Sequence, residues 1–108
     1  MEEWIAKFLL NMRSQRGFSP HTLRAYSKDL GEFRDFCGKR HIADVAALGR
    51  LEVRAYLSLV QSGGHARNTM LRKISAVRSF VAFLLEHDAL KADPFLLLPL
   101  PKKEKRLP

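Results

Sequence analysis

The stretch GFSPHTLRAYSKDL, residues 17–30, has a near-repeat further along the chain in GHARNTMLRKISAV, residues 64–77. Aligned on their first glycines, the two segments and the residues after them share a threonine and their apolar positions: Thr22 with Thr69, Leu23 with Met70, Leu30 with Val77, Phe33 with Phe80, and Phe36 with Phe83. Apolar residues at this three-and-four spacing lie on one face of an α-helix. The near-repeat therefore predicts two helices that bury similar faces.

The segment GFSPHTL has the residues of a helix start. Ser19 is a good N-cap, and Pro20 takes the first helical position, where its missing N–H costs nothing. Phe18 and Leu23 occupy the two positions of a hydrophobic staple. This helix is expected to run to about Cys37, with Gly38 as its stop.

Most of the remaining chain also has helical spacing. We expect a first helix over residues 2–16, a third that ends at Gly63 and Gly64, and a fourth over about 66–87. The third helix has a poorly signalled start, because AALGR (46–50) offers no good capping side chain. Ile42 and Val45, in the connector after the second helix, are expected to pack against the core. The predicted core residues on the helices are Trp4, Ile5, Phe8, Leu9, Met12, Leu23, Tyr26, Leu30, Phe33, Cys37, Val53, Tyr56, Leu57, Val60, Met70, Ile74, Val77, Phe80, Val81 and Leu84.

The end of the chain has a different composition. Asp93-Pro94 forces an extended residue before the proline and ends regular helix. The segment LPLPKKEKRLP, residues 98–108, is punctuated by prolines and charged, which is typical of a linker. We therefore predict a helical domain over residues 1–95 and an interdomain linker over 96–108.

Length and charge narrow the class of protein. The chain has 108 residues and a net charge of +8, with 19 Lys and Arg against 11 Asp and Glu. One small domain with this excess suits a polyanionic partner such as DNA, RNA or an anionic membrane surface. The single cysteine, Cys37, excludes an intramolecular disulfide and a cysteine-based zinc site. Since no apolar run approaches the length of a membrane span, we expect a cytoplasmic protein.

The sequence offers no credible active site. The four histidines lie on separate predicted elements without metal-ligand spacing. Tyr26 and Tyr56 occupy apolar stripes, and Gly63-Gly64 lacks the lysine and hydroxyl residue of a phosphate loop. Asp29 and Glu32 are expected on a solvated helix face. We therefore expect no catalysis by these residues, no cofactor, no metal and no small-molecule ligand.

The polar helix faces are more informative. In the fourth helix, a stripe away from the core combines small or amide side chains with arginine and is flanked by further cations: Asn68, Arg72, Ser75 and Ser79, with Arg67, Lys73 and Arg78 beside them. The second helix carries His21, Arg24 and Lys28 opposite its apolar face. Thr22 and Thr69 fall in the first turns, where hydroxyls and backbone N–H groups suit phosphate oxygens or simple capping. Such faces suit DNA, although two solvated basic faces would look the same.

Four segments together resemble a known family: SPHTLRAYSKDLGEFRDF (19–36), TMLRKISAVRSFVAFLLE (69–86), ADPF (92–95) and LPKKEKRLP (100–108). The chain is similar over practically its whole length to the N-terminal core-binding domain of tyrosine recombinases, the Xer-type recombinases and phage integrases. RKISAVRSF (72–80) is the most specific match. Two departures are Ala66, where relatives commonly have serine, and ALGRLEV (47–53), which lacks a polar cap.

The resemblance implies an all-α, SAM-like orthogonal bundle of two crossed helical hairpins, often with a short further helix. It implies that the second and fourth helices face the major groove of a recombination half-site, as half of a C-shaped clamp. The implied DNA contacts are Thr22, Arg24, Lys28, Arg67, Asn68, Thr69, Arg72, Lys73, Ser75, Arg78 and Ser79, with Lys102, Lys103, Lys105 and Arg106 of the linker tracking phosphates.

The same resemblance places catalysis in a further, C-terminal domain that these residues do not include. It implies strand exchange through a 3′-phosphotyrosyl link, without metal or nucleotide, in an assembly of four protomers. The main alternative is a helical protein-interaction module with an incidental basic surface. An RNA-binding helical domain is disfavoured, because the sequence offers no exposed aromatic residues for base stacking.

Overall fold

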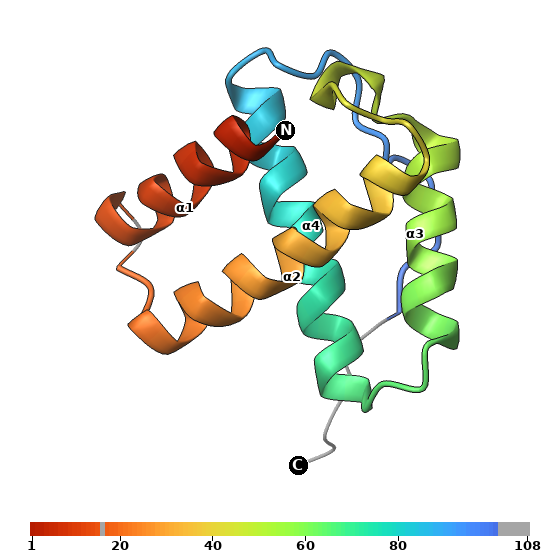
Figure 1. Cartoon of the computed structure of the whole chain (residues 1–108), viewed down its shortest axis with the longest axis horizontal. Coiled ribbons are helices and arrows are strands. Elements are labelled where there is room, and N and C mark those ends of the chain that lie inside the picture. Colours follow the sequence, from red (N-terminus) through yellow and green to blue (C-terminus); the bar gives the residue numbers. More distant parts are fainter. Residues whose placement is uncertain (16, 102–108) are drawn as a thin grey trace.

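A computed structural model describes residues 1–15 and 17–101 and contains four α-helices (Figure 1). They are α1 (Glu2–Gln15), α2 (Pro20–Lys39), α3 (Arg50–Ser62) and α4 (Arg67–Glu86), with one short 3-10 helix, η1 (Val45–Ala47), before α3. The described residues form no strand, so the predicted all-α fold is confirmed. No helix in this part of the chain is long and apolar enough to cross a membrane.

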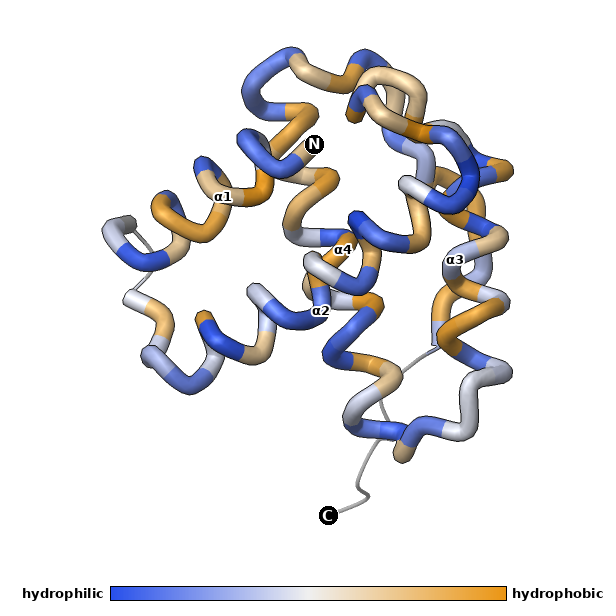
Figure 2. Tube along the Cα trace, in the orientation of Figure 1, coloured by the Kyte–Doolittle hydropathy of each residue, from blue (hydrophilic) through white to orange (hydrophobic). Residues whose placement is uncertain are grey.

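The helices form two hairpins that cross. α1 packs beside α2, α3 packs beside α4, and α2 runs across α4 near the middle of both (Figure 1). The hydropathy of α2 and α4 alternates along each helix (Figure 2), as expected for helices with one buried face. The arrangement agrees with the SAM-like bundle predicted from the sequence.

The start of α2 is as predicted. The Ser19 hydroxyl oxygen accepts a hydrogen bond from the backbone N–H of Thr22 at 3.1 Å, and Pro20 is the first helical residue. The end of α2 differs from the prediction, because the helix passes through Gly38 and ends at Lys39. His41 rather than Gly38 takes the left-handed conformation, with φ of 61°.

The two helices of the near-repeat, α2 and α4, have the same hydrogen-bond pattern at their C-terminal ends. After α2, the N–H of Ile42 donates to the carbonyl of Cys37 at 2.8 Å, around left-handed His41. After α4, the N–H of Ala89 donates to the carbonyl of Leu84 at 3.0 Å, around a left-handed residue, Asp88, with φ of 57°. Each is a Schellman-type ending in which a residue other than glycine takes the left-handed position. The similarity of the two helices therefore extends beyond their last turns.

The start of α3 has a cap that the sequence reading missed. Gly49 is the N-cap residue, and its backbone N–H donates to the Glu52 carboxylate at 3.0 Å. The capping side chain comes from inside the helix, three residues after the cap position, as in one half of a capping box. The residues before the helix therefore carry no sign of this cap.

The core lies between the two hairpins and contains most of the predicted residues. Phe33, Val77 and Phe80 are at most 1% exposed. Six predicted core residues are only half-buried: Trp4, Leu9, Leu23, Tyr26, Ile42 and Met70. Several residues outside the prediction are buried: Leu48, Phe83, Leu90, Phe95 and Leu98.

The segment after Pro94 returns along α3 (Figure 1). The Asp93 carboxylate accepts a hydrogen bond from the N–H of Phe95 at 2.9 Å, and Phe95 and Leu98 are buried. Leu98 and Pro99 line a shallow depression together with Arg54, Leu57, Ser58 and Gln61 of α3. Leu98 and Pro99, which the sequence assigned to the linker, therefore lie against α3, whereas Leu96 and Leu97 are exposed. Lys102, Lys103, Lys105 and Arg106 lie outside the described residues.

Candidate nucleic-acid interface

The outward face of α2 carries two of the predicted cations. Arg24 and Lys28 are exposed and lie one turn apart. Thr22 is half-buried, and its hydroxyl lies 3.0 Å from the Ser19 hydroxyl, within hydrogen-bonding distance. The structure therefore places the Thr22 hydroxyl against the capping residue Ser19, and leaves Arg24 and Lys28 at the surface.

The outward face of α4 carries most of the predicted stripe. Asn68, Ser75 and Arg78 are exposed, as is Arg67. Thr69, Arg72 and Ser79 of the same helix are half-buried. Ala66 caps α4 without a side-chain hydrogen bond, as its departure from the family pattern implied. The stripe is solvent-facing, as its spacing predicted.

Asp29 is the main departure from the sequence reading. We expected it on a solvated face, but its side chain is 0% exposed. The two carboxylate oxygens accept hydrogen bonds from Arg72, from Nε at 2.8 Å and from Nη2 at 3.0 Å. This is a paired, side-on contact between a guanidinium and a carboxylate, the strongest geometry available to an arginine and an acid.

Lys73 is the second correction. Its side chain is 5% exposed, so it does not flank the stripe at the surface. The ammonium lies 3.3 Å from Asp29 Oδ1 and also contacts the Glu32 carboxylate. Asp29, Glu32, Arg72 and Lys73 together form what we call the crossing network, because α2 and α4 cross at this point.

The crossing network has a clear effect on the electrostatics of α4. Its two cations and two anions compensate each other, and the hydrogen bonds to Asp29 raise the pKa of Arg72. Two of the basic residues of α4 are therefore neutralised by α2. The surface charge available to a partner comes from cations outside the network, chiefly Arg24, Lys28 and Arg78.

The signal that could have identified the network is its spacing. Asp29 lies three residues after Tyr26 and four before Phe33, which places it within the apolar stripe of α2. Lys73 lies in the same relation to Met70 and Val77 in α4. An acid in one buried stripe and a base in another must pair if the two helices meet, because an unpaired buried charge is costly.

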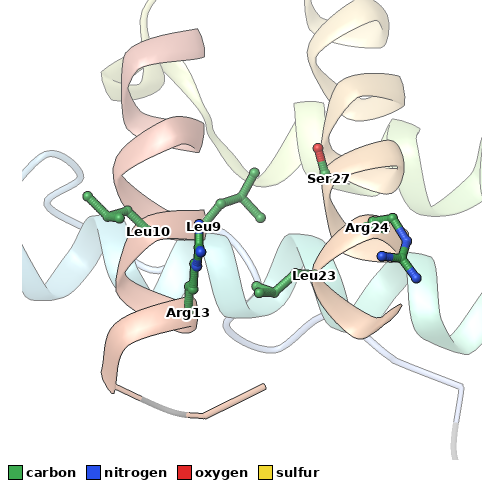
Figure 3. Close-up of a pocket in the computed structure, with 6 residues that line it drawn as sticks. All are labelled: Leu9, Leu10, Arg13, Leu23, Arg24 and Ser27. Atoms are coloured by element: carbon green, nitrogen blue, oxygen red, sulfur yellow. The ribbon is translucent and has the colours of Figure 1, made fainter. Parts of the chain in front are cut away.

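A groove between α1 and α2 was not expected from the sequence. Leu9, Leu10 and Arg13 of α1 line it together with Leu23, Arg24 and Ser27 of α2, and Figure 3 shows Leu9 and Leu23 pointing toward each other. The groove has a volume of about 350 Å³ and is open to solvent. Its lining is mainly apolar, with an arginine on each wall. Arg24 therefore belongs both to this groove and to the basic face of α2.

The nucleophilic side chains have the surroundings of core residues. Burial, followed by the nearby Asp29 carboxylate, raises the pKa of the Tyr26 phenol. Burial likewise raises the pKa of Tyr56, and the buried Tyr56 hydroxyl has no hydrogen-bond partner among the described residues. Burial raises the pKa of the Cys37 thiol to about 11. These environments disfavour the ionised, reactive forms.

Four helices arranged as two crossed hairpins, with basic outer faces on the two crossing helices, define a SAM-like helical domain. The sequence of residues 5–88 matches the protein-family model of the phage integrase N-terminal SAM-like domain, so the chain belongs to this family. The resemblance inferred from the sequence is therefore confirmed.

Relatives with curated descriptions agree with this family. The chain is 39% identical over 107 residues to the tyrosine recombinase XerC of Halalkalibacterium halodurans, covering 99% of this chain and 35% of the relative. It is 37% identical to XerC of Listeria innocua and 40% identical to XerC of Staphylococcus carnosus, each covering 94% of this chain and 34% of the relative. The chain thus spans about a third of these relatives. No solved structure matches it.

Proposed function

We propose that this chain is the DNA-binding, core-binding part of a site-specific tyrosine recombinase, and that it docks on one half of a recombination site through α2 and α4. The observation that carries the proposal is the placement of exposed cations on the outer faces of two crossing helices, in a chain of net charge +8. Small polar residues between these cations allow a helix to approach base edges while the cations bind phosphates.

The proposed contacts fall into three groups. The exposed residues are the first group: Arg24, Lys28, Arg67, Asn68, Ser75 and Arg78. Half-buried Thr22, Thr69, Arg72 and Ser79 are the second group. Lys102, Lys103, Lys105 and Arg106 are proposed as phosphate contacts of the linker. Lys73 is buried, and we propose that it supports the surface from beneath.

The activity of the longer protein is part of the same proposal. The relatives are tyrosine recombinases, and this chain covers about a third of their length. We propose that a catalytic domain outside these residues exchanges strands through a 3′-phosphotyrosyl link, and that it grips the opposite side of the DNA. Four such protomers would assemble on two sites, in the cytoplasm and on the nucleoid. No residue of this chain is proposed as catalytic.

The test is duplex DNA binding measured by fluorescence anisotropy over a range of salt concentrations. About four to six phosphate contacts predict a slope of roughly −4 to −5 in a plot of log affinity against log salt, because each contact releases condensed counterions. A protein-interaction module with an incidental basic surface would bind DNA hardly at all at low salt. That result would reject the proposal.

A matched pair of double variants locates the surface. Arg24→Ala with Lys28→Ala removes two cations from the proposed face and should weaken binding and flatten the slope by about two. Arg50→Ala with Arg54→Ala removes the same charge, at the same spacing, from exposed positions of α3, which is not part of the proposed surface. If both pairs weaken binding equally, the DNA is held by net charge and not by α2.

A further inference from the structure

We propose that the buried Asp29 carboxylate positions Arg72 for reading DNA, although Asp29 itself contacts no DNA. The inference rests on the proposed function and deepens it, because it assigns a specificity role to a residue outside the contact surface. It is carried by the side-on pairing of the two groups and by the difference in their burial.

The pairing uses one edge of the guanidinium. Arg72 donates from Nε and Nη2 to the two oxygens of Asp29. A guanidinium has five N–H groups in a planar fork, so Nη1 and the outer N–H of Nη2 form a second, end-on pair of donors. Among the described residues, the structure gives Nη1 of Arg72 no acceptor. This second pair has the geometry that guanine or a phosphate accepts.

Burial determines which edge faces outward. The Asp29 side chain is 0% exposed and that of Arg72 is 38% exposed. The edge in contact with Asp29 is therefore the inner one, and the exposed part of Arg72 includes the edge that remains. Asn68 and Ser75 lie about one turn away on either side and are exposed, so this edge sits in the middle of the polar stripe of α4.

Asp29 is itself held in place from the inside. Its Oδ1 is shared between Arg72 Nη2 at 3.0 Å and Lys73 Nζ at 3.3 Å, and Lys73 also contacts Glu32. Two partners on one buried carboxylate fix its orientation. An arginine anchored on such a group has already lost most of its rotamer freedom, so less entropy remains to be lost when DNA binds.

The sign of the expected effect separates positioning from simple electrostatics. Asp29 is an anion near the proposed DNA surface, so its neutralisation alone should strengthen binding to any duplex. If Asp29 positions Arg72, its neutralisation should instead reduce the preference for the cognate sequence. The ratio of specific to random affinity is therefore the diagnostic quantity.

The experiment first selects a preferred site from a random duplex library with the unmodified chain. Anisotropy at fixed salt then compares this duplex with a scrambled one for Asp29→Asn, Arg72→Ala and the double variant. We expect Asp29→Asn to lower the specificity ratio about tenfold, and to have less than a twofold effect in the Arg72→Ala background. Asp35→Asn, which neutralises an exposed acid of the same helix, should leave the ratio unchanged.

Three results would overturn the inference: an unchanged ratio in Asp29→Asn, an equal loss in Asp35→Asn, or a loss of similar size in the Arg72→Ala background. Selection that enriches no sequence would also overturn it, because nothing is then read. The absence of any duplex binding at low salt would instead reject the proposed function itself.

A second variant covers the case in which Asp29→Asn fails to fold, as judged by circular dichroism. Arg72→Lys keeps a cation beside Asp29 but presents a single nitrogen in place of a fork. It should bind the scrambled duplex as the unmodified chain does and lose the specificity ratio as fully as Arg72→Ala. A retained ratio would show that no oriented fork is being read.

Discussion

Two contacts on α4 hold the molecule together by different means. Toward its C-terminal end, α4 meets α1 through an aromatic cluster, which comprises Trp4, Phe8, Phe80, Phe83 and His87, with ring centroids 4.1–6.3 Å apart. Toward its N-terminal half, α4 meets α2 through the crossing network. The aromatic contact is apolar and tolerates small changes of angle, whereas the network requires particular donors to meet particular acceptors.

Along α4, folding stability and the positioning of side chains depend on different kinds of contact. Burial of aromatic rings supplies much of the free energy of folding without fixing a unique register. A paired buried charge adds less net stability, because desolvation offsets the attraction, but removal of one partner is costly. The part of α4 that carries most of the proposed DNA contacts is therefore the part whose geometry is fixed by charge.

Phe80→Ala should give the largest loss of stability. Phe80 is 0% exposed, and its ring lies 5.7 Å from that of Phe8. The cavity and the lost burial should lower the free energy of unfolding by about 3–5 kcal/mol, measured by urea denaturation. Leu51→Ala removes a side chain that is 73% exposed and should change stability by less than about 0.5 kcal/mol. Equal effects would mean that the aromatic cluster does not hold α1 to α4.

Asp29→Ala should follow, with a loss of about 3 kcal/mol, because Lys73 then keeps a buried charge with one fewer partner. The matched control is Asp35→Ala, which removes an exposed acid paired with Arg34 and should cost between about 0 and 1 kcal/mol. Urea midpoints of the two variants give the comparison directly. If Asp29→Ala were no worse than its control, the crossing would be held by apolar contacts alone.

The reactivity of the Cys37 thiol reports how well the apolar core around it is closed to solvent. Burial raises its pKa from 9.0 to about 11, so the folded state favours the protonated thiol. At pH 8 this should slow alkylation by iodoacetamide about a hundredfold relative to the urea-unfolded chain, since the thiolate is the reactive form. Stability from this thiol is complete below pH 9 and is lost as the pH rises toward 11. Fast alkylation of the folded chain would contradict this.

Tyr56→Phe should have the smallest effect, and its sign is opposite to the others. The Tyr56 hydroxyl is buried without a partner among the described residues, and the ring packs 4.9 Å from Phe33. Removal of the oxygen keeps the packing and relieves an unsatisfied polar group, so stability should rise by about 0–1 kcal/mol. A fall in the melting temperature of more than a few degrees would show that the hydroxyl has a partner.

The helices and their capping were mostly predictable from the sequence, because they depend on residues within a few positions of each other. Ser19 and Pro20 predicted the start of α2, and the apolar spacing predicted the inward faces that hold Phe33 and Phe80. The errors at helix ends also have local causes: Glu52 caps α3 from within, and His41 takes the left-handed position after Gly38.

The proposed interface was predictable in part. The exposure of Asn68, Ser75 and Arg78 follows from helix periodicity alone. The roles of Arg72 and Lys73 do not, since helix spacing places charges on a face but cannot say what approaches that face. The packing of Leu98 on α3 was missed for the same reason.

Neighbouring residues in the sequence are sufficient to predict the helical class, the turns at which helices begin, and the excess of positive charge. Which charges remain available depends on the fold, because Asp29 meets Arg72 across 43 positions of the chain and only where α2 crosses α4. Periodicity acts over three or four residues, whereas pairing across a helix crossing depends on the angle and the register at which two distant segments pack.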